Sequence, residues 1–229
     1  FSITKWRWNQ RAEQYTATTS IRGFDKVVEY IMDHRKDVAP PDGHIPGFRL
    51  VHSTPRKGGG RSAAALTGLC VTVLDLSDME AIHHVLASEE VSHLLVELPS
   101  RGNPRGPLEP AFVLILPFVR PMPWDRFLQY NDELRQLHLH VRAWLRSKAD
   151  CRLTGLGPDQ AALYPFIFLP CRMSQNAPEP KGFILPGRRA LDLDAFLEGL
   201  DDGVPFPTED SAASEDLEAA AGIGLSPPL

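Results

Sequence analysis

Apolar residues dominate a run in the first half of the chain that ends at two acids. Val71 and Val73 lie within the run, and Asp75 and Asp78 follow it, three residues apart. A nearly continuous apolar run of this kind is typical of a strand that is buried on both faces. The pattern therefore predicts a buried strand over residues 68–74, with acidic side chains at its carboxyl end.

The rest of the hydrophobic pattern predicts strands and helices in β-α-β-β-α-β order. This order indicates an α+β domain with a mostly antiparallel sheet and flanking helices. The first helix spans about 24–35, where apolar residues recur at helical spacing, and Ser20 or Asp25 is expected to cap it. The other expected elements are helices at 78–87, 124–145 and 192–200 and strands at 92–98, 111–118, 164–170 and 183–185.

The first segment of the chain mixes aromatic and basic residues. Trp6 and Trp8 alternate with Lys5 and Arg7, and Arg11 follows. Such a mixture fits a surface that stacks nucleobases, and it equally fits an ordinary edge strand. The pattern favours the edge strand.

The acids after the buried strand have two interpretations. Carboxylate oxygens at a strand end can hold a hard divalent cation such as Mg²⁺. Alternatively, Ser77 or Asp78 caps a helix that begins at Met79. The local pattern leaves both interpretations open.

Charge is distributed unevenly along the 229 residues, whose formal net charge is -5. After Arg189 there are ten acids and no Lys or Arg, so residues 1–189 hold 19 acids and 24 bases, a balance of +5. A basic body permits phosphate binding, for which the acidic tail can compete. We expect one domain over 1–200 and a disordered or loosely docked tail over 201–229.

Cysteine usage and hydropathy exclude several classes of protein. The three cysteines are widely spaced and lack a Cys-x-x-Cys pair, which argues against a disulfide framework or a zinc site. No apolar run approaches the roughly 20 residues that span a bilayer, and no secretory signal is evident. The expected location is a reducing cytoplasm.

Glycine and histidine positions complete the candidate chemistry. Residues 55–61 form a cationic, glycine-rich loop, but it lacks the Gly-Lys-Ser/Thr of a Walker loop. His138 and His140 are two residues apart on a predicted helix, so they point in different directions and are poor joint metal ligands. We expect solvated or capping roles for them, and likewise for His83 and His84.

Several weak motifs follow one another in a recognisable order. Arg35, Lys36 and Asp37 end the first helix, the Gly and Arg-rich turn follows at 58–62, and the buried strand runs into the acids at 75–78.

The order continues through the later strands. Ser100 and Arg101 follow the strand at 94–98, and the next strand runs into Arg120 and Pro121. Asp159 then precedes an apolar strand that ends at Leu169-Pro170. Over about residues 20–190 this order resembles the archaeo-eukaryotic primase superfamily, particularly the primase-polymerase domains of phages and plasmids.

The resemblance implies an RRM-like primase catalytic core and two-metal nucleotidyl transfer that makes or extends primers in DNA replication. Asp75, Asp78 and Asp159 would be the catalytic acids and hold the Mg²⁺ or Mn²⁺ ions. Ser100, Arg101 and Arg61 would bind the incoming nucleotide. The implied partners are single-stranded DNA, nucleoside triphosphates and a helicase or other replication protein, in a mobile genetic element and away from any membrane.

The chain departs from the family pattern at three points. Ser77 stands where the second acid is expected, so Asp78 is displaced by one residue. Arg101 replaces a histidine, and the third acid is Asp159 or Asp150. These changes raise an alternative function: a primase-like module with a degenerate active site that binds nucleic acid or protein without catalysis.

Overall fold

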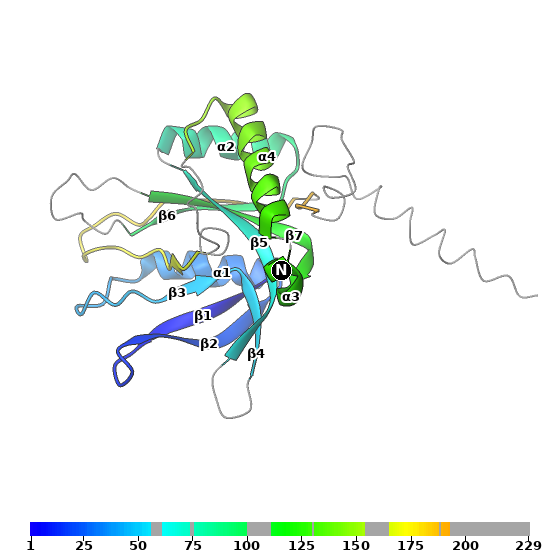
Figure 1. Cartoon of the computed structure of the whole chain (residues 1–229). Helices are drawn as coiled ribbons and strands as arrows, with labels where there is room; N and C mark the ends of the chain where they lie inside the picture. Colours follow the sequence, from blue (N-terminus) through cyan, green and yellow to red (C-terminus); the bar gives the residue numbers. More distant parts are fainter. Residues whose placement is uncertain are drawn as a thin grey trace, which may run out of the picture.

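Three layers of secondary structure are stacked in this protein (Figure 1). Two helices cover one face of a five-stranded sheet, and a four-stranded sheet with a further helix lies on its other side. The computed structural model describes residues 1–55, 61–73, 76–99, 111–129, 131–153, 165–187 and 189–192.

The five-stranded sheet has the order β4-β5-β7-β6-β9, and every neighbouring pair is antiparallel. At its centre β5 has Val71 fully buried on one face and Cys70 buried on the other, but Thr72, the next residue on the Cys70 face, is exposed, so the predicted burial on both faces holds only as far as Cys70. The strands are β4 (Val51–Pro55), β5 (Arg61–Val73), β6 (His93–Leu98), β7 (Ala111–Pro123) and β9 (Gly182–Leu185).

Helices α2 (Leu76–Ser88) and α4 (Asn131–Ala149) pack on one face of this sheet. Their apolar stripes meet β5, β6 and β7 in the larger of two hydrophobic cores, where Phe127 of α3 (Trp124–Gln129) is also buried. The single helix expected over 124–145 corresponds to α3 and α4, with residue 130 between them outside the described residues. None of the described helices is long and apolar enough to cross a membrane.

The second sheet has the order β2-β1-β3-β8 and is also antiparallel. The smaller core lies between this sheet, α1 (Phe24–Asp33) and the remaining face of the five-stranded sheet. A 3-10 turn, η1 (His34–Lys36), extends α1. The strands are β1 (Ser2–Asn9), β2 (Gln14–Arg22), β3 (Gly47–Arg49) and β8 (Ile167–Phe168).

The predicted fold class, α+β with mostly antiparallel strands, is confirmed, but the strands form two sheets instead of one. The expected cap of α1 was wrong: Gly23, with φ 91°, occupies the N-cap position, and Ser20 and Asp25 do not. The predicted helix at 192–200 and the tail at 201–229 lie outside the described residues, except Asp192.

Candidate functional site

The carboxyl end of β5 is the place where the sequence predicted chemistry. Asp78 is described there, whereas Asp75, Ser100, Arg101 and Asp159 lie outside the described residues. The backbone of Arg61 is described, and it begins β5 at the end opposite Val73. Thirteen strand residues at about 3.3 Å each separate the two ends by roughly 40 Å, so Arg61 is not brought to Asp78.

Asp78 lies in the first turn of α2, which begins two residues before it at Leu76. One carboxylate oxygen, Oδ2, accepts the backbone N–H of Arg152 at 3.2 Å and lies 3.6 Å from Nε of the same arginine. The side chain is 13% exposed. The positive end of the helix dipole also favours a carboxylate at this position. The contacts with Arg152 join α2 to the segment that follows α4.

That segment, residues 151–153, runs beside the end of β5. Leu153 forms an antiparallel bridge with Val73, and its carbonyl accepts hydrogen bonds from two arginines of α4. Nη2 of Arg142 donates at 3.0 Å and Nη2 of Arg146 donates at 2.9 Å. Together with Arg152, these side chains place three cations beside the carboxyl end of β5.

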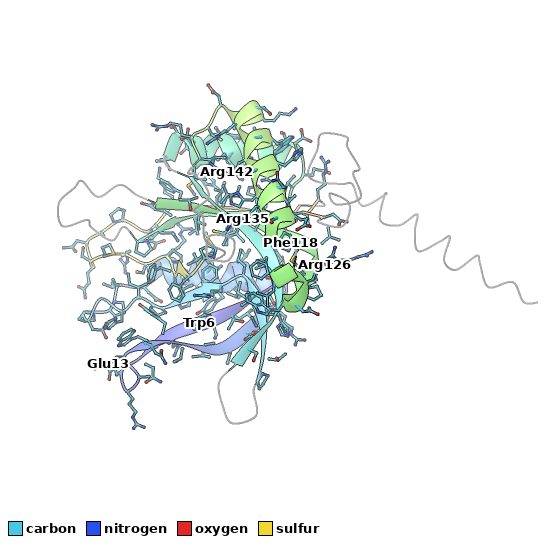
Figure 2. The ribbon with its side chains drawn as sticks, in the orientation of Figure 1. Trp6, Glu13, Phe118, Arg126, Arg135 and Arg142 are labelled. Carbon is cyan, nitrogen blue, oxygen red and sulfur yellow. The ribbon has the colours of Figure 1, made fainter. Side chains whose placement is uncertain are left out.

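Arg142 is 5% exposed although its side chain is charged. Burial lowers its pKa, and the neighbouring Arg146 lowers it further. One turn earlier on the same face, His138 is 4% exposed, so the prediction of a solvated or capping His138 was wrong. Figure 2 shows Arg142 on α4, in the helical layer at the top of the view.

His138 is held in its neutral form. Its Nε2 lies 3.1 Å from the carbonyl oxygen of Cys70, and because a carbonyl only accepts, Nε2 carries the hydrogen. Burial lowers the pKa of His138 to about 4, and Arg142 contributes in the same direction. Its other ring nitrogen, Nδ1, is buried and has no hydrogen-bond partner among the described residues.

Two further acids lie near this end of the sheet. Glu97 of β6 is level with Val73, since both pair with Phe112 of the intervening β7. Its Oε2 accepts the backbone N–H of Lys181 at 2.9 Å. Asp150, the alternative third acid, follows α4 with a left-handed φ of 47°. Over the described ranges, no group of three or more His, Cys, Asp or Glu side chains is placed to hold a metal ion.

A cavity of about 360 Å³ lies elsewhere, between β1, α1 and the segment before β3. Arg7, Tyr30, His34 and Asp37 contribute its polar lining. Burial raises the pKa of Tyr30, while Arg7 lowers it to a smaller extent. The Asp37 of the primase-like motif order therefore lines this cavity and not the end of β5.

Comparisons with protein families, with curated proteins and with solved structures find no match to this chain. The site is therefore interpreted from its own residues. The arginines at the end of β5 were not predicted from the sequence. One pattern indicated Arg142: it is four residues after His138, and both continue the apolar stripe of Leu134 on α4. A polar residue at a core position of an amphipathic helix indicates a specific buried partner.

Proposed function

We propose that this chain is a primase-like domain that binds single-stranded nucleic acid in a replication system and does not itself polymerise nucleotides. The order of motifs from Arg35 to Pro170 supports the primase-like part of the proposal. The contacts of Asp78 and the cations around residues 151–153 support binding without catalysis.

The environment of Asp78 is the observation that carries the proposal. A two-metal site needs carboxylate oxygens that are available to the ions. Oδ2 of Asp78 already accepts a backbone N–H and faces the Arg152 guanidinium. A cation this close favours an ion pair over a metal ligand, so Asp78 does not fit the role that the resemblance implies for it. Ser77, in the position expected for the second acid, supports the same conclusion.

The charge of the domain supports nucleic-acid binding. Residues 1–189 have a formal balance of +5, and Arg146 and Arg152 lie beside the end of β5, whereas the third arginine there, Arg142, is buried. Arginine binds phosphate through a planar fork of N–H donors. The Arg152 side chain faces Asp78 and is 69% exposed, so it lies at the surface of this end of the sheet.

A primer-synthesis assay tests the absence of polymerisation. The wild-type chain and an Asp75→Ala variant are incubated with a single-stranded template, labelled nucleoside triphosphates and either Mg²⁺ or Mn²⁺. We expect no template-dependent product from either protein. A product that the wild-type chain makes with metal, and that the Asp75→Ala variant does not make, would overturn the proposal in favour of an active primase-polymerase.

A further inference from the structure

One face of the four-stranded sheet carries a continuous group of aromatic side chains. They come from β1, β2, the segment before β3, and β8 with the residues just before it. All of them are partly exposed. This group, the aromatic face, consists of Trp6, Trp8, Tyr15, His44, Phe166 and Phe168.

Strand register places these rings on the side of the sheet away from the core. Lys5, Phe48 and Ile167 are paired across β1, β3 and β8, and Phe48 and Ile167 belong to the smaller core. The next row is Trp6, Gly47 and Phe168, which points to the opposite face because side chains alternate along a strand. Figure 2 shows Trp6 in the lower sheet, in a different layer from Arg142.

The rings contact one another in sequence across this face. Trp8 stacks on His44 with ring centroids 4.0 Å apart and an interplanar angle of 8°. Trp8 also meets Tyr15 edge to face at 5.3 Å, and Tyr15 lies 4.9 Å from Phe166. The hydroxyl of Tyr15 donates to the carbonyl of Ile45 at 2.9 Å, which fixes the ring. The face is therefore ordered by its own contacts.

Gly47 makes room for this arrangement. A Cβ atom at position 47 would lie 2.4 Å from the ring of Phe166 and 2.6 Å from the carbonyl oxygen of Ile167. Without a side chain at this position, the Phe166 ring lies directly over the backbone of β3. Glycine at this position thus lets the Phe166 ring approach the backbone of β3 closely.

Positive charge accompanies the aromatic face. The Arg49 guanidinium lies 5.2 Å from the Trp6 ring centroid, within the range of a cation–π contact. The turn between β1 and β2 adds one base, Arg11, and one acid. The acid, Glu13, lies at the hairpin turn, at the lower left of Figure 2. Lys5 and Arg7 alternate with the tryptophans and point to the opposite face, toward Tyr30 of α1.

We infer that the aromatic face is a stacking platform for single-stranded nucleic acid. Unpaired bases present flat π surfaces to stack on rings, and the phosphates between them are attracted to the neighbouring cations. A polypeptide partner would find less room here to insert apolar side chains between the rings, because the rings are already packed edge to face against one another. The inference shares with the proposed function only the expectation of nucleic-acid binding; it places that binding on a different surface from the end of β5.

Fluorescence titration of the full chain tests the platform. The probes are oligothymidylate and oligouridylate of about 20 nucleotides, long enough for the 4–16 nucleotides that a stacking domain typically covers. Two of the four tryptophans, Trp6 and Trp8, lie on the face, whereas Trp144 is buried and Trp124 is partly buried against the larger core. Stacked bases are therefore expected to quench the first pair selectively.

The central comparison is between Trp8→Phe and Trp8→Leu. Phenylalanine keeps a ring that can stack, whereas leucine keeps apolar area without one. We expect Trp8→Leu to weaken binding about tenfold and Trp8→Phe to weaken it much less. Leu139→Ala is the matched control, since Leu139 is an exposed apolar residue, 47% exposed, on α4. Circular dichroism checks that each variant is folded.

Salt dependence separates stacking from charge. Stacking is not screened by ions, so the ratio of wild-type to Trp8→Leu affinity is expected to persist as salt rises, whereas the loss caused by Arg49→Ala, which removes the cation beside Trp6, is expected to shrink. A preference for one probe identifies DNA or RNA as the ligand. Equal binding by Trp8→Leu and wild type would overturn the inference and leave the proposed function standing. An absence of binding to both probes by the wild-type chain would overturn both.

Discussion

Replacing Asp78 by alanine is expected to destabilise the protein. The variant removes the acceptor of the Arg152 backbone N–H and the carboxylate in the first turn of α2. It leaves the helix itself intact, because alanine has the highest helix propensity. The sign of the effect is informative: an acid within a cluster of metal-ligating carboxylates is repelled by its neighbours, so its removal stabilises the metal-free protein.

The magnitude follows from the contacts. A hydrogen bond to a charged group contributes about 1.5–3 kcal/mol, and the 3.2 Å distance places this one at the lower end. The helix dipole adds about 0.3–1 kcal/mol. The ion pair adds little, because the Arg152 side chain is 69% exposed. The total is about 2 kcal/mol, which shifts a urea midpoint by about 1 M when m is about 2 kcal/mol/M.

Urea denaturation followed by circular dichroism, in buffer with a chelator, measures this shift. Glu80→Ala is the control, because Glu80 is an exposed acid on the same helix; its effect is expected to stay within about 0.5 kcal/mol. An Asp78→Ala protein that is more stable than wild type would refute the structural role of Asp78. The same conclusion would follow if Mg²⁺ stabilised the wild-type protein but not the variant.

Two further predictions concern the sheet and the buried histidines. Gly47→Ala is expected to destabilise the fold by about 1–3 kcal/mol, since its Cβ would meet a carbonyl oxygen at 2.6 Å; thermal denaturation measures this. The pKa values of His93 and His138 are lowered to about 4 by burial, so the unfolded chain binds more protons than the folded one in acid. Stability is therefore expected to fall between about pH 6.5 and 4, and His138→Gln is expected to reduce that loss in urea titrations at each pH.

Local patterns predicted the elements of the fold better than their assembly. The apolar run around Val71 identified β5 and its burial on both faces as far as Cys70, because that information lies within the strand itself. Pairing between strands depends on residues far apart in sequence, as when Phe48 pairs with Ile167. The hydrophobic pattern of single segments therefore could not predict that the strands divide into two sheets.

The candidate site shows the same limit. The acids after β5 were visible in the sequence, but the partner of Asp78 is Arg152, which is 74 residues away. The bridge between Val73 and Leu153 brings that partner to the end of the strand. The burial of His138 was in principle readable from the stripe of α4, whereas its acceptor, the Cys70 carbonyl, was not.

The dependence of single-stranded DNA binding on divalent metal distinguishes a binding domain from an active polymerase. The affinity of the full chain for a labelled oligothymidylate is measured by fluorescence anisotropy at constant ionic strength, with a chelator or with Mg²⁺. We expect binding of equal affinity in the two buffers, because no metal takes part, and a steep loss of affinity as salt rises. Binding that requires Mg²⁺ would contradict this expectation.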